Sequence, residues 1–230
     1  MGLEKVTSVN DAPAKRRYDD ACGTALALDL VGERWALLVV RELMFGPRRF
    51  GQIREQLTGI SANVLTQRLE GMIAAGIVER QVLPPPASVG VYALTEWGYE
   101  SVPIFDAMVR WALRSRRHDP SLPLSPASLM MSMRALIDRQ AARDLAIVAG
   151  FRFGDDAFVA RISGGAMHVE RAPVENTEFV LEGSPNALIR VIYGKHPLAP
   201  LEAQGAITVS GDREAAERFT ALFALPSKVD

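Results

Sequence analysis

Two short helices separated by a tight turn constrain the fold of this chain more than any other feature. RFGQIREQL places Phe50, Ile53 and Leu57 at helical spacing, and TGI follows it as a turn. Ser61 is then suited to cap the next helix, which continues through VLTQRLEGMIAA. Helices joined by a turn of three or four residues form a helix-turn-helix, so we predict that motif here.

The flanking segments predict the winged version of the motif. We expect helices at 21–31 and 35–45, then strands at 77–83 and 91–95 joined by PPPASVG, then a helix at 96–116. A third helix behind the pair and a β-hairpin after it complete a winged helix-turn-helix.

One face of the helix capped by Ser61 is polar and nearly uncharged. Asn63, Thr66, Gln67 and Glu70 recur at i, i+3, i+4 and i+7. The second helix of such a motif enters the DNA major groove, where base edges match amide and hydroxyl groups. We therefore expect this face to read bases, with ordinary solvated surface as the alternative. The predicted DNA-binding residues are Arg48, Arg49, Ser61, Asn63, Thr66, Gln67 and Arg68, the arginines chiefly through phosphates.

Composition places the chain among globular proteins of one or two domains. It has 230 residues, of which 48% are hydrophobic and 23% charged. No apolar run is long enough to span a membrane, and the start lacks a hydrophobic signal region, so we expect a cytoplasmic protein. The single cysteine excludes an internal disulfide, and the net charge of −1 gives no independent sign of nucleic-acid binding.

The basic, proline-containing stretch RSRRHDPSLPLSPAS divides the chain. We expect a flexible arm (1–20), a winged-helix DNA-binding and dimerisation domain (21–117), a linker (118–127) and a second domain (128–230). The predicted fold class is α+β, the second domain being an antiparallel sheet with helices. Its expected elements are helices at 126–141, 185–194 and 213–223, and strands at 145–153, 156–163, 166–172, 178–183 and 206–211.

From Cys22 to Trp111 the chain resembles the HxlR-type winged-helix transcriptional regulators, relatives of the MarR group. The motifs that carry this resemblance are GERW, GPRRF, GISANVLTQRLEGMIAAGIVER and YALTEWG. It implies a homodimer paired through its terminal helices, which addresses a palindromic double-stranded DNA operator without a cofactor. The wing PPPASVG lacks the basic residue usual in the family, which shifts the expected backbone contacts to Arg49 and to Lys15, Arg16 and Arg17.

Some members of that family use the equivalent of Cys22 to sense oxidants or electrophiles, so Cys22 is a possible redox sensor. The thiolate is the reactive form, and its pKa falls at helix N-termini and near positive charge. The alternative is a small apolar core residue.

The second domain resembles the sterol-carrier-protein-like fold, through EFVLEG, a helix ending in YGK, and the closing GAITVSGDREAAERFTALF. This resemblance implies a pocket for a small hydrophobic effector; plain core is the alternative for each residue. The candidate lining residues are Phe151, Phe153, Phe158, Phe179, Ile189, Ile192, Tyr193 and Phe219.

The sequence offers no catalytic or metal-binding constellation. His118, His168 and His196 are scattered, and no paired-carboxylate spacing occurs, so we expect no enzyme, no metal and no cofactor. The alternative function is a lipid- or hydrophobe-binding protein that uses the winged helix for protein contacts only.

Overall fold

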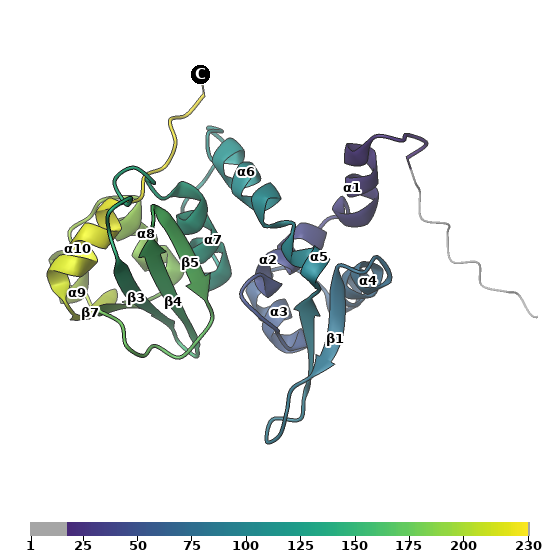
Figure 1. Cartoon of the computed structure of the whole chain (residues 1–230), viewed down its shortest axis with the longest axis horizontal. Coiled ribbons are helices and arrows are strands. Elements are labelled where there is room, and N and C mark those ends of the chain that lie inside the picture. Colours follow the sequence, from purple (N-terminus) through teal and green to yellow (C-terminus); the bar gives the residue numbers. More distant parts are fainter. Residues whose placement is uncertain (1–17, 230) are drawn as a thin grey trace, which may run out of the picture.

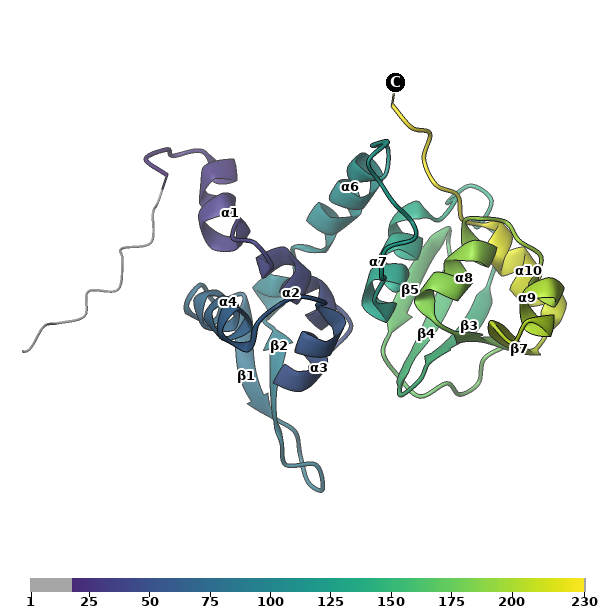
Figure 2. The same cartoon turned by 180° about the vertical axis from the view of Figure 1, so that it is seen from behind.

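Residues 18–229 are described by the computed structural model, which places a winged helix-turn-helix beside a five-stranded sheet domain (Figure 1). The predicted arm contacts at Lys15, Arg16 and Arg17 lie outside the described residues. Seen from both sides, the wing hairpin points away from α1 and α6, which stand at the opposite end (Figure 2).

The N-terminal domain has the predicted order of elements. These are α1 (Gly23–Val31), α2 (Ala36–Leu43), α3 (Phe50–Gln56), α4 (Ala62–Ala74), β1 (Val78–Val82), β2 (Gly90–Leu94), α5 (Glu96–Tyr99) and α6 (Val102–Ala112). The two strands form an antiparallel hairpin. Buried side chains of α2, α3 and α4 meet in one core, which holds α3 and α4 as the helix-turn-helix pair.

Local sequence explains where α4 begins and ends. The Ser61 hydroxyl accepts a hydrogen bond from the Val64 amide at 3.3 Å, as predicted for a helix cap. Gly76 follows the helix with a φ of 75°, a conformation that glycine adopts without steric cost.

The single helix expected at 96–116 is instead two helices. Thr95 caps the four-residue α5 by accepting from the Gly98 amide at 3.0 Å. Pro103 then lies in the first turn of α6, where its missing N–H costs least. A proline inside one continuous helix would have broken the hydrogen-bond ladder, so the chain restarts there.

The C-terminal domain consists of α7 (Pro126–Leu136), β3 (Ile147–Phe153), β4 (Asp156–Ser163), β5 (Ala166–Glu170), β6 (Phe179–Gly183), α8 (Pro185–Ile192), α9 (Leu198–Ala203), β7 (Ile207–Gly211) and α10 (Arg213–Ala221). The sheet order is β5-β4-β3-β6-β7. The α+β class is therefore confirmed, and the apolar faces of α7, α8 and α10 contribute to the same core as the sheet.

Three features of this domain differ from expectation. β3 and β6 pair in parallel, so the sheet is mixed, because the chain leaves β5 and returns on the far side of β3. α7 ends earlier than predicted, at Leu136, because Ile137 turns to an extended conformation and bridges to Phe223. α9 was not predicted, since Pro197 before it and Pro200 within it are typical of a loop.

Candidate nucleic-acid interface

The polar face of α4 is open to solvent. Asn63, Thr66 and Gln67 are exposed, whereas Leu65 and Leu69 on the opposite side are fully buried. Ser61 is also exposed, and its hydroxyl is occupied by the helix cap. The amide and hydroxyl groups predicted to read bases are thus held outward by a helix whose other side is fixed in the core.

The two neighbouring arginines before α3 have different environments. Arg49 is exposed at the N-terminal end of α3, and its amide donates to the Gln52 side chain at 2.9 Å. Arg48 is buried, and its guanidinium binds the carboxylate of Asp156 in the C-terminal domain. The structure therefore gives Arg48 a carboxylate partner within the protein, in contrast to the phosphate contact expected from the sequence.

Arg68 is partly buried and has local partners. Its guanidinium pairs with Glu33 at 3.1 Å and donates to the Arg34 carbonyl at 3.0 Å. These contacts tie α4 to the loop before α2, and they leave Arg34 itself exposed, stacked over the Trp35 ring at 5.2 Å.

The wing carries a basic residue that the sequence analysis did not single out. Arg80 is exposed on β1, and its guanidinium lies 5.5 Å from the centre of the Tyr92 ring. It borders a groove of about 380 Å³ between the hairpin and Phe50 at the start of α3. The basic side chain therefore comes from the strand and not from the PPPASVG loop, and its position in VERQV was the available signal.

The eight candidate pocket residues gather in the C-terminal core. Phe151, Phe158, Phe179, Ile192 and Phe219 are buried, while Phe153, Ile189 and Tyr193 are partly buried. Their aromatic rings contact one another, with centroid distances of 5.5 Å for Phe179–Phe219 and 5.8 Å for Phe151–Phe219. A groove of about 330 Å³ lies elsewhere, between α8, α9 and α10.

Tyr193 is the one polar member of this set. Its hydroxyl bonds to the Ser132 hydroxyl at 2.6 Å, and burial raises its pKa above the ordinary tyrosine value. The side chain therefore stays neutral and joins α8 to α7 at physiological pH.

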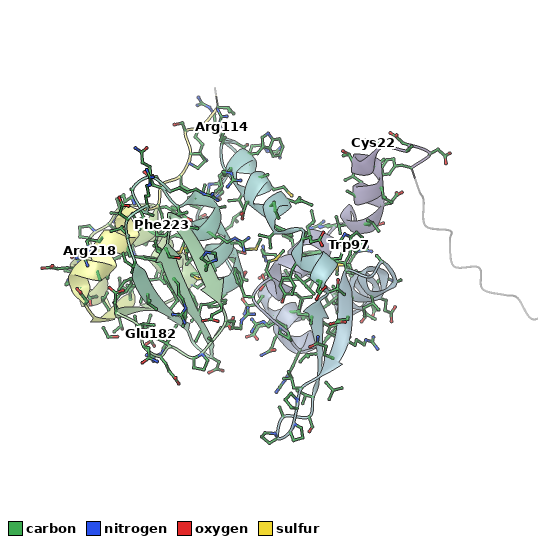
Figure 3. All side chains as sticks on the ribbon, viewed as in Figure 1. Cys22, Trp97, Arg114, Glu182, Arg218 and Phe223 are labelled. Carbon is green, nitrogen blue, oxygen red and sulfur yellow. The ribbon has the colours of Figure 1, made fainter. Side chains whose placement is uncertain are left out.

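Cys22 is an exposed free thiol that immediately precedes α1 (Figure 3). Hydrogen bonds from the Thr24 backbone, the Thr24 side chain and the Ala25 backbone lower its pKa. Exposure and a favoured thiolate are the two conditions for a reactive cysteine, whereas the apolar core role requires burial.

Metal sites and membrane-spanning helices are two further features to consider in the described residues. Within 18–229, no group of three or more His, Cys, Asp or Glu side chains is placed to hold a metal ion. In the same range, no helix combines the length and the apolar character that crossing a membrane requires.

The two domains are similar to different families of known proteins. Residues 30–119 match the family model described as HxlR-like helix-turn-helix, and residues 120–229 match the one described as alkyl sulfatase C-terminal. The second match leaves the sterol-carrier resemblance unconfirmed. It concerns the C-terminal domain alone, so it does not make the chain an enzyme.

The curated relatives include HTH-type transcriptional regulators. The chain is 42% identical over 86 residues to the HTH-type transcriptional regulator YodB of Bacillus subtilis, covering 37% of this chain and 77% of the relative. It is 39% identical over 111 residues to an HTH-type transcriptional regulator of Synechocystis, and the match covers 46% of this chain and 82% of the relative. The solved structure of quinone-bound YodB is 38% identical, with a TM-score of 0.34, covering 39% of this chain and 93% of that one.

Proposed function

The chain belongs to the HxlR-like helix-turn-helix family, and we propose that it is a homodimeric regulator that binds a palindromic DNA operator through α4. Its relatives are HTH-type transcriptional regulators, which supports DNA binding. The observation that carries the proposal is the exposed row of Asn63, Thr66 and Gln67 on a helix whose other face is buried. Side-chain amides and hydroxyls in that position match base edges in the major groove.

We propose that Arg49, Arg34 and Arg80 contact the phosphates on either side of the reading helix. All three are exposed, one before α3, one before α2 and one on the wing. Phosphate contacts fix the register of a protein on DNA and make its affinity depend on salt. Arg68 would hold α4 in place through Glu33 instead of binding DNA itself.

We propose that the dimer forms through α1 and α6. Ile104, Met108 and Trp111 are exposed at i, i+4 and i+7 on α6, and Leu26 and Leu28 are exposed on α1. Apolar side chains repeated on one face of a helix are the usual sign of a partner surface. Because α1 and α6 stand at the end opposite the wing, a dimer formed there leaves both wings free (Figure 2).

The operator proposal is tested with Gln67→Ala and Arg49→Ala on a labelled duplex selected from random DNA by the purified protein. If both the oxygen and the nitrogen of the Gln67 side-chain amide bind one base, Gln67→Ala should reduce the binding free energy by about 1–3 kcal/mol. It should also relax specificity at that base position. Arg49→Ala should weaken binding to every duplex alike and reduce the slope of log affinity against log salt by about 1. Fluorescence anisotropy across a salt series measures both; unchanged binding in both variants would mean that α4 does not face the DNA.

We further propose that the C-terminal domain binds a small hydrophobic effector among its core aromatic rings or stabilises the dimer. The support is its separate sheet-and-helix fold, docked against the DNA-binding domain. Native mass spectrometry of the purified protein would show a retained hydrophobic molecule. A protein that carries lipid yet retards no DNA would favour the alternative, a hydrophobe-binding protein.

A further inference from the structure

One contact between the two domains centres on the carboxylate of Asp156, the first residue of β4. Arg48 of the N-terminal domain binds one carboxylate oxygen at 2.9 Å, and Arg171, which follows β5, binds the other at 2.8 Å. The three side chains are only 7%, 11% and 15% exposed for Arg48, Asp156 and Arg171. Two cations therefore share one buried anion across the domain boundary.

Arg48 also fixes the start of the DNA-binding elements. Its main chain forms a pair of hydrogen bonds with Tyr92 of β2, at 2.9 and 2.8 Å. The next residue, Arg49, occupies the N-cap position of α3. Arg48 thus joins the C-terminal domain both to the wing and to α3, the first helix of the helix-turn-helix.

Aromatic packing shields this ionic contact from water. The Arg171 guanidinium lies 4.8 Å from the centre of the Phe158 ring, and Phe158 meets Phe45 of the N-terminal domain edge-on at 5.6 Å. Nε of Arg48 and both terminal nitrogens of Arg171 have no hydrogen-bond partner among the described residues. The negative charge near Arg171 comes first from Asp156 and then from the buried carboxylate of Glu42. Removing one partner of such a group leaves an uncompensated buried charge.

We propose that Asp156 and Arg171 are positioning residues for DNA binding: from the C-terminal domain, they hold Arg48 and thereby set the placement of α3 and the wing. This inference rests on the proposed function, since it assigns the C-terminal domain a direct effect on operator affinity. It also explains why an arginine in the GPRRF motif is buried and unavailable to DNA.

The test compares Asp156→Asn and Arg171→Gln with a matched pair of controls. Arg161→Gln and Glu170→Gln remove the charges of an exposed ion pair between β4 and β5; its two side chains are 3.0 Å apart and 51% and 58% exposed. Hydrogen exchange followed by mass spectrometry would report on peptides covering 46–52 and 90–93. Anisotropy with the selected duplex would report on DNA affinity.

We expect Asp156→Asn and Arg171→Gln to speed exchange in both peptides and to weaken operator binding about threefold to thirtyfold. The controls should change neither, and Asp156→Glu, which keeps the charge, should recover most of the protection. Circular dichroism identifies any variant that fails to fold. If one variant does not fold, the other variant is compared with Asp156→Glu and with the two controls.

Unchanged exchange at 46–52 in the folded variants, or an equal change in the controls, would overturn the inference. Wild-type protein that binds no duplex would end the proposed function instead. The exchange measurement needs no DNA, so these two failures are distinguishable.

Discussion

Arg48 and Arg49 show how adjacent side chains of one type acquire different roles. Arg49 has an extended backbone, with φ −71° and ψ 154°, and successive side chains of an extended chain point to opposite sides. One guanidinium is consequently buried against Asp156, and the other stays in solvent at the start of α3. The solvent-exposed arginine is therefore the one available to phosphate.

The thiol of Cys22 should react at lower pH than an ordinary cysteine. Its pKa is lowered by hydrogen bonds at the start of α1, chiefly from the Thr24 backbone, so more thiolate exists below the ordinary thiol pKa. The rate advantage over the urea-unfolded chain should be present below the ordinary thiol pKa and disappear as the pH rises above it. Iodoacetamide labelling over a pH series measures it, with Thr24→Ala expected to shrink the difference. A thiol that stays inert up to pH 9 would contradict the prediction.

Replacement of two glycines by alanine should change the stability of the protein in opposite directions. A methyl group at Gly98 in α5 would lie 2.3 Å from the Ile77 carbonyl oxygen, so backbone must shift. Gly98→Ala should destabilise the protein by about 1–3 kcal/mol. Gly71 in α4 has open space at the same position, so Gly71→Ala should stabilise by about 0.4–1 kcal/mol. Urea unfolding measures both changes, and a neutral Gly98→Ala would show that α5 is free to move away from the wing.

Among the elements, α6 carries the most exposed large aromatic side chain of the described chain, Trp111, at 79%. Trp111→Ser should weaken self-association at least about tenfold if α6 forms the dimer surface, since buried tryptophans dominate interface energies. Leu122→Ser is the control, because Leu122 is 62% exposed in the segment before α7. Sedimentation velocity over a concentration series measures the dimer fraction. Equal dimer fractions for wild type and Trp111→Ser would exclude α6 from the interface.

Polar caps made several helices predictable from the sequence. Ser61, Ser125, Ser184 and Asp212 each accept from a backbone amide three residues on, and each begins a helix that was expected. α9 follows Pro197 and has no side-chain cap, so local signals were absent. The β3–β6 pairing was missed because the direction of a strand in a sheet depends on the path of the chain, not on its own residues.

The candidate DNA-binding site, like the fold, could be predicted from the sequence only in part. The polar face of α4 follows from helical spacing alone, and the structure exposes it. The burial of Arg48 does not follow from any local pattern, because its partner Asp156 lies 108 residues further along the chain. Arg80 lies on β1, so the sequence of the PPPASVG loop gives no sign of this basic residue of the wing.

Across the whole molecule, the C-terminal domain contacts α6, the proposed dimer helix, as well as the helix-turn-helix domain. Arg134 of α7 pairs with Asp106 of α6 at 3.0 Å, and Arg110 of α6 donates to the Ala135 carbonyl at 3.1 Å. The C-terminal tail returns to the same helix, where Lys228 donates to the Leu113 and Ser115 carbonyls at 2.9 and 3.0 Å. A structural change in this domain would therefore reach both the proposed dimer surface and the proposed DNA-binding surface.

These contacts should make the two domains unfold together. Phe45 is 7% exposed and packs edge-on against Phe158, so Phe45→Ala removes apolar contact at the boundary itself. We expect one calorimetric transition in the wild type and two in Phe45→Ala, with the N-terminal domain melting first, because a cavity of this kind costs about 3–5 kcal/mol. Phe179→Leu, inside the C-terminal core, should lower the melting temperature without splitting the transition. Two separate transitions in the wild type would show that the domains are only loosely docked, and that Asp156 is not a firm link between them.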